Sequence, residues 1–487
     1  MANIKRNLFY NFLLSYSQVV LPLVSIPYVS SVLGPAGVGK VGFIDSFTYY
    51  FVTLAEFGIM VYGIREVAKE RNNPARLNAI VSELITLHII SSLCTMLLYM
   101  AGVIVLWNKI GDIRLLLFSA SFFIVNFFAC DWYFMGMERF GFITLRSVII
   151  RLLGLASIFI LVRQPSDYYL YYAIIVASAI AGTIWNNFIL FREVRFSWRK
   201  VNWKKHLPFV WITYLITLFY SVPLMLDSVL LGIISTASAV GLYVFSAKLV
   251  RTGTTLLTDS FLVFFPRVVS LSKENEQTQL QQKLLLNIRF IILFSIPMGM
   301  GLYLVADEFT HVFLGDKFLA AAQNLRWLAV FPFLKGVSLF LSNPVLIAHH
   351  REKLFLRNLV AGTLIFVAAA ILLGTYYADT GICMALVAAE LFMVTINYFT
   401  VRRVLPSLPV FDLEALVHAL IGSSVFIPIV WVVKENILAD WGRLLVIIPL
   451  CIAVYSLFLL LMKNSLAIQA KSILAGVFIK KTKSTDP

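Results

Sequence analysis

Ionisable residues lie inside the most apolar parts of this 487-residue sequence. Residues 221–260 are typical of two membrane-length apolar helices joined by an uncharged turn, yet they include Asp227, Lys248, Arg251 and Asp259. Each such group costs about 2.5 kcal/mol or more in a bilayer on insertion scales, so it normally faces a polar interior or a transport path. Lys248 and Arg251 are three residues apart and share one helical face. We predict that this face lines a positively charged cavity through which an anion passes.

A second interpretation of the same residues needs no cavity. Asp227 and Lys248 would pair and hold two neighbouring helices together, because a partner offsets the cost of burying either charge alone. Arg251, one turn deeper than Lys248, would then need a partner of its own. The sequence leaves both interpretations open.

The charges inside apolar runs cluster in depth. At about 1.5 Å of rise per residue, five of them lie between the outer end and the middle of their helices: Asp45, Asp227, Lys248, Arg251 and Lys335. A shared cavity predicts this clustering, although ion pairs between helices would also produce it. We assign substrate binding to Lys248, Arg251, Lys335 and the deeper Arg151, and ion coupling or pairing to Asp45, Asp227 and the nearly interfacial Glu56. Asp131 and Glu390 also lie in apolar runs, without an assigned role.

Residue patterns typical of enzymes are absent from the sequence. The six histidines form no HExxH pattern, and none has a nucleophile and a carboxylate at a catalytic spacing. Segment 34–39, GPAGVG, lacks the GK[ST] ending and the preceding strand of a nucleotide-binding loop, so we predict a turn. The lack of a Walker motif argues against an ATP-driven pump. We expect no enzyme activity, no metal and no cofactor, and the four scattered cysteines fit neither a disulfide framework nor a zinc site.

The composition indicates which elements must position these charges. The chain is 60% hydrophobic and 13% charged, against about 45–50% and about 25% in soluble domains. Its apolar runs have the length of about 20 residues that a transmembrane helix needs, whereas barrel strands are about half as long. The predicted fold class is an all-α polytopic membrane protein.

The apolar runs predict about 14 transmembrane helices. They cover residues 8–32, 38–62, 80–106, 114–135, 143–162, 168–191, 208–233, 240–264, 286–305, 322–348, 356–377, 381–400, 414–434 and 443–462. We expect a short extra helix in the region 306–321. With the N-terminus inside, 28 Lys and Arg residues lie on the cytosolic side and 8 on the outer side. This positive-inside pattern predicts that both termini are cytosolic, and it explains the net charge of +15 without a nucleic-acid partner.

Matching features indicate an internal repeat. Segment 31–43, with Gly34 and Gly39, is echoed by segment 228–245, with Gly232 and Gly241. Two halves that both begin in the cytosol would form a parallel repeat about an axis along the membrane normal. We predict two six-helix lobes in parallel pseudo-repeat plus two C-terminal helices. The parts are an N-terminal lobe (1–191), a basic cytosolic linker (192–207), a C-terminal lobe (208–404), spans 13 and 14 (405–463) and a basic cytosolic tail (464–487).

The linker combines basic and aromatic residues. Phe196, Trp198 and Trp203 stand among six Lys and Arg residues, a composition typical of a segment at the level of the lipid headgroups. It would bind anionic membrane lipid or a lipid-linked substrate in one interpretation. In the other, which we favour, it anchors the topology and tethers the two halves.

Four stretches of the sequence resemble the bacterial polysaccharide flippases of the Wzx type, in the superfamily that also holds multidrug exporters and lipid II flippases. They are Val32 to Gly39 with Tyr49-Tyr50-Phe51, Phe57-Gly58-Ile59 with Tyr62 to Ala68, Asp131 to Phe140, and Met225 to Gly232 with Val240 to Tyr243 and Lys248-Leu249. The most specific are the third stretch and the cytosolic motif Gly63-Ile64-Arg65-Glu66, which supplies Arg65 and Glu66 as candidate residues. The resemblance covers spans 1 to 12.

The resemblance implies a fold of two lobes and 12 to 14 helices around a central, often cationic cavity. It also implies a location in the bacterial cytoplasmic (inner) membrane. Such proteins flip undecaprenyl-diphosphate-linked oligosaccharide units from the cytosolic to the outer leaflet by alternating access, with H⁺ or Na⁺ antiport as a plausible energy source. The expected partners are therefore the lipid-linked oligosaccharide of an O-antigen, lipopolysaccharide or capsule, a coupling ion, and the polymerase and other polysaccharide-assembly proteins.

Two alternatives to the flippase interpretation remain. A drug/cation antiporter of the sister family should have an acidic cavity, whereas Lys248, Arg251 and Lys335 are cationic. A membrane polysaccharide polymerase or ligase typically needs large outer loops with catalytic residues, and the predicted outer connectors are short. The flippase is the leading prediction.

Overall fold

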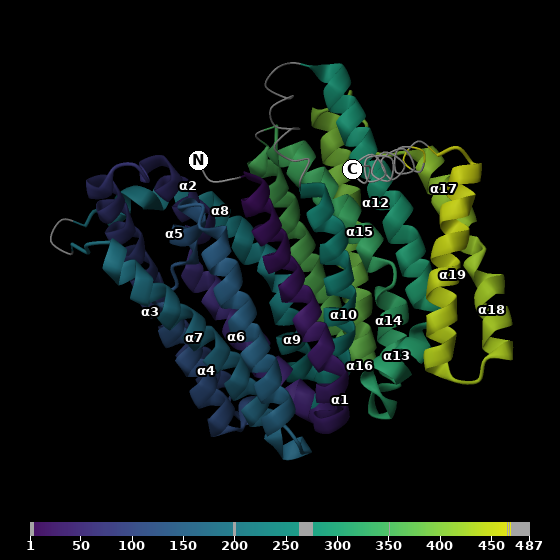
Figure 1. Cartoon of the computed structure of the whole chain (residues 1–487), viewed down its shortest axis with the longest axis horizontal. Helices are drawn as coiled ribbons and strands as arrows, with labels where there is room; N and C mark the ends of the chain where they lie inside the picture. The colour runs from purple at the N-terminus through teal and green to yellow at the C-terminus, as the bar shows by residue number, and fades with distance from the viewer. Residues whose placement is uncertain are drawn as a thin grey trace, which may run out of the picture. The chain divides into compact units, whose positions relative to one another are not determined.

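The computed structural model describes residues 4–197, 201–262, 276–349, 351–464, 466 and 468 (Figure 1). Within those ranges the regular secondary structure is entirely helical. Ten of the helices found there are long and apolar enough to cross a membrane. The predicted all-α polytopic membrane fold is confirmed.

Two of the longest helices each contain a pair of predicted spans. Helix α1 (Ile4–Glu56) is interrupted at Gly34, whose φ of 65° and ψ of 176° are not helical. This break falls in the turn predicted between spans 1 and 2, and glycine adopts a positive φ without steric cost. Helix α16 (Glu352–Val404) is interrupted at Ala378, with φ 48° and ψ −124°, between predicted spans 11 and 12.

The chain divides by compactness into two units, of which the first comprises Met1–Phe245 and Thr363–Ile382. Besides α1, it contains α2 (Ile59–Glu70), α3 (Pro74–Ile110), α4 (Ile113–Asn126), α5 (Asp131–Gly136), α6 (Phe140–Leu161), η1 (Pro165–Asp167), α7 (Tyr168–Glu193), η2 (Trp203–His206), α8 (Leu207–Ser221), η3 (Val222–Leu226) and α9 (Asp227–Ile234). The start of α10 (Ala237–Leu262) and the middle of α16 belong to it as well. Helix α1 packs against α3 and α6, and α7 packs against α4 and α6.

The second unit comprises Ser246–Gly362 and Cys383–Pro487. Its other elements are α12 (Gln277–Leu304), α13 (Ala306–Leu314), η4 (Asp316–Phe318), α14 (Ala321–Leu328), α15 (Phe331–Phe340), η5 (Leu341–Ile347), α17 (Leu413–Ser424), α18 (Phe426–Asn436) and α19 (Asp440–Leu461). Helix α13 is the short extra helix expected between residues 306 and 321. Helices α17, α18 and α19, yellow in Figure 1, pack on one another, and α17 packs on α12. The predicted lobes 1–191 and 208–404 rest on internal repetition and stay a prediction.

The ends of α3 follow from local sequence. Asn73 precedes the helix, and its side-chain oxygen accepts a hydrogen bond from the backbone N–H of Arg76 at 3.2 Å. Pro74 takes the first helical position, where its missing N–H costs nothing. At the other end Gly111 adopts a φ of 56° and its N–H bonds to the carbonyl of Trp107, which stops the helix.

Hydroxyl groups from neighbouring helices satisfy carbonyls that prolines leave open. Pro223 has no N–H for the carbonyl of Phe219, and Thr363 Oγ1 donates to that oxygen at 3.0 Å. Pro297 likewise leaves the carbonyl oxygen of Leu293 without a backbone N–H donor. The hydroxyl of the buried Tyr455 donates to that oxygen at 2.8 Å. Prolines are tolerated in membrane helices where neighbours satisfy the freed backbone groups in this way.

Two of the repeated glycine segments cross each other within the first unit. A Cβ atom on Gly39 would stand 1.6 Å from the carbonyl oxygen of Ala237. In the reciprocal contact, a Cβ atom on Gly241 would stand 2.0 Å from the carbonyl oxygen of Pro35. The backbones therefore approach so closely that only glycine fits at either position. We name this feature the glycine crossing.

Candidate functional site

Lys248 and Arg251 lie less than one turn apart on the continuous helix α10, and both side chains are partly buried. Residues three apart in an α-helix project from nearly the same face. The helix therefore meets the geometric requirement of the predicted cationic face, and the role of that face in binding substrate stays a prediction. Asp259 is on the same helix, and its side chain lies outside the described residues.

Asp227 is fully buried where a membrane helix changes its hydrogen-bond register. Helix α8 continues through the π-helix η3, which contains Pro223, into α9, which Asp227 begins. The carboxylate accepts hydrogen bonds from Tyr243 Oη at 2.5 Å, from the backbone N–H of Ser228 at 2.5 Å and from Ser228 Oγ at 3.1 Å. Single π turns occur frequently at functional sites. The pairing of Asp227 with Lys248 stays a prediction.

Lys335 forms a buried ion pair with Glu390, which the sequence analysis had left without a role. Lys335 Nζ lies 2.6 Å from Glu390 Oε1, and the two side chains are 10% and 7% exposed. Lys335 belongs to α15, which leads into the π-helix η5 with Pro344. Within the described part of the chain, the second carboxylate oxygen, Glu390 Oε2, is buried without a hydrogen-bond partner. Lys335 is therefore a cation whose charge is already shared with an anion.

Arg151 reaches from α6 to the first half of α1. Its Nη1 donates to Ser17 Oγ at 2.6 Å and to the carbonyl of Leu14 at 3.4 Å. The Arg151 guanidinium is thus held by neutral acceptors, and those contacts leave its positive charge uncompensated.

Asp45 and Glu56 are partly buried on the second half of α1.

The predicted site residues divide between the two compact units. The first unit contains Asp45, Glu56, Arg65, Glu66, Arg151 and Asp227, and the second contains Lys248, Arg251 and Lys335. A single cavity lined by members of both groups stays a prediction.

The cytosolic motif residues Arg65 and Glu66 form a local cluster on α2. Glu66 Oε1 lies 3.3 Å from Arg65 Nε and 2.8 Å from Lys69 Nζ. The Arg65 guanidinium also lies over the ring of Tyr62, 5.2 Å from its centroid. The exposed side chains of Arg65 and Lys69 make these pairs weak contributors to stability.

A buried polar network beside this motif was missed by the sequence analysis. Glu83 on α3 accepts a hydrogen bond from Lys205 Nζ at 2.9 Å and contacts His206 Nε2 at 3.1 Å. The other ring nitrogen of His206 contacts Tyr62 Oη at 2.8 Å. Burial lowers the pKa of His206 below its ordinary value, and the Glu83 carboxylate opposes part of that effect. Glu83 lies in predicted span 3, so its charge was the signal that could have identified the network.

A second network surrounds Asp131, which lies in one of the most specific motif stretches. Its Oδ1 accepts hydrogen bonds from Arg146 Nη2 at 3.0 Å and from Asn186 Nδ2 at 2.9 Å. Arg146 is one of the 28 Lys and Arg residues that the positive-inside pattern assigns to the cytosolic side, but its side chain is 8% exposed and buried in the packing of α6. The motif residue therefore joins α5, α6 and α7.

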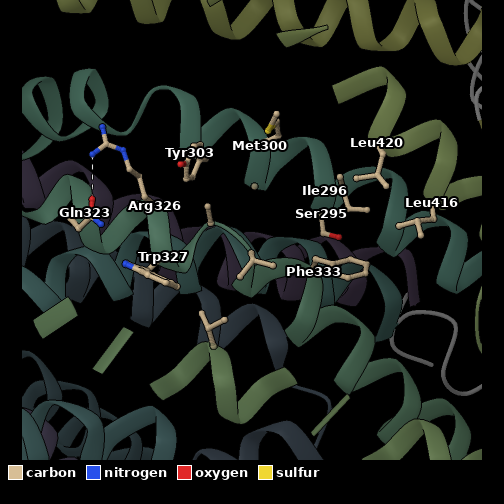
Figure 2. Close-up of a pocket in the computed structure, with 14 residues that line it drawn as sticks. Ser295, Ile296, Met300, Tyr303, Gln323, Arg326, Trp327, Phe333, Leu416 and Leu420 are labelled. Atoms are coloured by element: carbon tan, nitrogen blue, oxygen red, sulfur yellow. Dashed lines mark hydrogen bonds between the residues drawn. The ribbon is translucent and has the colours of Figure 1, made fainter. Parts of the chain in front are cut away.

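The second unit contains an apolar groove of about 650 Å³ between α12, α14, α15, α16 and α17. Figure 2 shows Gln323 and Arg326 at one end of the groove and Leu416 and Leu420 at the other. Trp327, Val330 and Leu420 are 39%, 42% and 53% exposed, so the walls of the groove face outward from the unit. Apart from Gln323 and Arg326 its lining is almost wholly apolar, which suits a hydrocarbon chain.

The fold is that of a known class of membrane transporters. The structure of the lipid II flippase MurJ in an inward closed conformation matches with a TM-score of 0.72 at 13% identity, covering 94% of this chain and 99% of that chain. An inward-facing multidrug resistance transporter of the MATE family, in the MOP superfamily, matches with a TM-score of 0.61 at 16% identity, covering 79% of this chain and 94% of that chain. The shared feature at these identities is the fold.

The model of the family described as polysaccharide biosynthesis protein matches residues 4–272. The chain belongs to this family, which confirms the resemblance drawn from the motif stretches. Two similar proteins carry the provisional name of O-antigen transporter. The one from Shigella dysenteriae is 23% identical over 80% of this chain and 98% of its own length, and the one from Escherichia coli (strain K12) is 24% identical over 82% and 97%.

Proposed function

We propose that this protein is a flippase that moves a diphosphate-linked oligosaccharide lipid from the cytosolic to the outer leaflet of the bacterial inner membrane. Three findings support the proposal: membership of the polysaccharide biosynthesis family, the names of the O-antigen transporter relatives, and a fold shared with a lipid II flippase. The single observation that carries it is the pair of partly buried cations, Lys248 and Arg251, on one face of α10.

A diphosphate is the anion for which these cations are suited. Arg presents a planar fork of N–H donors that matches phosphate oxygens, and Lys presents a compact point charge. In the low dielectric of a membrane interior, the attraction is far stronger than in water. The substrate also carries a long hydrocarbon tail, for which the apolar groove of the second unit offers an apolar lining.

Alternating access coupled to H⁺ or Na⁺ is the mechanism proposed for translocation. The buried Asp227 and the partly buried Asp45 and Glu56 are the proposed coupling groups in the first unit. The π-helix that precedes Asp227 supports this assignment, because single π turns inside α-helices occur frequently at functional sites.

An antiporter of cationic drugs is the alternative that the fold permits, because the fold likeness extends to a multidrug resistance transporter. A cavity for cations should place carboxylates where Lys248 and Arg251 stand. Two positive charges there favour an anionic substrate, so the flippase is the better supported function.

The test is surface display of polysaccharide in a strain that lacks this protein and is complemented with variants. We expect the deletion to accumulate lipid-linked glycan that faces the cytosol, and Lys248→Ala or Arg251→Ala to abolish display at wild-type protein levels. Lys353→Ala, at an exposed residue, is the control and should restore display. Normal display in both α10 variants would remove the assignment of the cationic face. A polymerase would instead leave single glycan units reaching the surface of the deletion strain.

A further inference from the structure

The Lys335–Glu390 pair in the second unit is bound through one carboxylate oxygen. Lys335 Nζ approaches Glu390 Oε1, whereas Glu390 Oε2 is buried and has no hydrogen-bond partner among the residues that the structure describes. A buried carboxylate held only to stabilise the fold normally has both oxygens satisfied, because an unsatisfied buried acceptor is destabilising, and more so when it is charged. Within the described residues, Glu390 is thus held at Oε1 by Lys335, whereas its Oε2 atom accepts no hydrogen bond.

Lys335 stands next to a change in helix register, and Glu390 lies within a membrane-length helix. Lys335 lies in the middle of predicted span 10, on a short helix that leads into the π-helix η5, in which Pro344 interrupts the normal bonding. Glu390 lies in the middle of predicted span 12. Unlike Arg, which has a rigid fork, Lys has three rotatable donors at the end of a flexible stem and can hold two anions at once.

We propose that Glu390 is a resident competitor for the anion site of Lys335, which weakens binding of the substrate's phosphate so that the substrate can leave. This inference rests on the proposed function, because the competing anion is the diphosphate of the transported lipid. In the empty protein the Lys335 ammonium is paired with Glu390. When a phosphate oxygen arrives, it shares the ammonium with the carboxylate, and when it departs the carboxylate compensates the charge again.

Such competition serves transport because a site that translocates its ligand must also release it. Binding has to be favourable enough for entry and weak enough for exit. A Lys in the membrane interior without a carboxylate partner would bind a diphosphate too tightly for release. When the site is empty, the same unpaired ammonium would carry a high desolvation cost. A carboxylate partner weakens the binding of the diphosphate and also compensates the ammonium charge in the empty site. Glu390 therefore acts as a positioning and tuning residue, and Lys335 as the group that contacts the anion.

The experiment measures binding of farnesyl diphosphate, a short-chain polyprenyl diphosphate, to the purified full-length protein in nanodiscs. We expect Glu390→Gln to bind about ten-fold more tightly than wild type, since one charge-assisted contact is no longer shared. Lys335→Met should bind about ten-fold more weakly, since that contact is lost. Glu435→Gln and Lys353→Met, at exposed residues, are the matched controls and should leave the Kd unchanged.

A second variant tests the same inference if Glu390→Gln does not fold. Lys335→Met/Glu390→Leu replaces the pair by apolar side chains of similar size, an exchange that buried ion pairs often tolerate. It should bind as weakly as Lys335→Met alone. In cells, Glu390→Gln should slow the display of polysaccharide while its purified form binds more tightly, a combination that a merely structural pair does not produce.

The outcomes separate this inference from the proposed function. If wild type binds the diphosphate and the folded Glu390→Gln variant binds it equally or more weakly, the competitor role is wrong and the flippase proposal stands. If wild type shows no diphosphate binding at all, the proposed function fails and this inference falls with it.

Discussion

Tyr455 on α19 donates its hydroxyl hydrogen to the carbonyl oxygen of Leu293, which Pro297 on the same helix α12 cannot satisfy. We expect Tyr455→Phe to lower the free energy of unfolding by about 0.5–1.5 kcal/mol, because a buried acceptor loses its partner. Thermal unfolding of the purified protein in detergent measures the change. Tyr376→Phe, at a side chain that is 77% exposed, is the control and should keep the wild-type Tm. Equal Tm values for the two variants would contradict the role given to the hydroxyl.

At the scale of single residues, the sequence indicated which charges lie in apolar runs but not which groups they contact. Lys335 was assigned to the cationic site because it lies in an apolar run, yet its partner Glu390 is 55 residues away on another helix. An apolar run indicates depth and carries little information about which face of a helix meets which neighbour. Arg146 illustrates the same limit, because its position near the end of a predicted span concealed its burial against Asp131.

The linker element η2 is joined to α3 by His206 and Glu83, and this junction should respond to pH. Burial lowers the pKa of His206, so between that value and the unfolded value of about 6.5 the unfolded chain binds more protons. Stability contributed by the neutral His206 is therefore present above about pH 6.5 and is lost as the pH falls. We expect the Tm in detergent to decrease from pH 7.5 to pH 5.5 in wild type, and to decrease less in His206→Gln.

His311 on α13 provides a control of opposite sign. Its hydrogen bond with Asp440 at the start of α19 raises the pKa of His311. Stability from this contact is therefore present at low pH and is lost as the pH rises through the raised pKa. His311→Gln should consequently leave the loss of Tm toward pH 5.5 in place or increase it. A His206→Gln variant with the full wild-type slope would exclude His206 as the source.

At the scale of elements, the predictable features were those with a local cause. The break at Gly34 was predicted because glycine and proline stand together in a segment that joins two apolar runs. The break at Ala378 has no proline, and the glycine of its segment, Gly381, lies three residues later, so the combined length of predicted spans 11 and 12 was the main reason to expect a break. The π-helices η3 and η5 were not predicted. Pro223 and Pro344 indicate a kink in each, but the register of the hydrogen bonds around it depends on neighbouring helices.

The orientation of the whole molecule is a prediction that labelling can test. The positive-inside bias places Arg71 in the cytosol and Lys109 on the outer side, and both side chains are exposed. In a variant without Cys94, Cys130, Cys383 and Cys451, we expect a membrane-impermeant maleimide to label Lys109→Cys in intact spheroplasts. Arg71→Cys should be labelled only after the inner membrane is permeabilised. The reverse pattern would overturn the orientation.

At the scale of the whole molecule, composition and motifs were sufficient to predict an all-α membrane protein and its family. The apolar groove could not be predicted, because its lining comes from five helices and is spread over residues 295–420. Trp327 and Leu420, for example, belong to different predicted spans, and nothing in the sequence around them indicates that they line the same surface. The position of such a groove follows from helix packing, which a single sequence does not contain.

The glycine crossing has a consequence for how the first unit could cycle. Gly39 and Gly241 meet the carbonyl oxygens of Ala237 and Pro35, so the backbones themselves are in contact at these two positions. Parting the segments would require no rotamer change at either glycine, because glycine has no side chain. The tolerance is one-sided: a methyl group added at Gly39 or Gly241 would keep the two backbones from meeting but would not obstruct their separation.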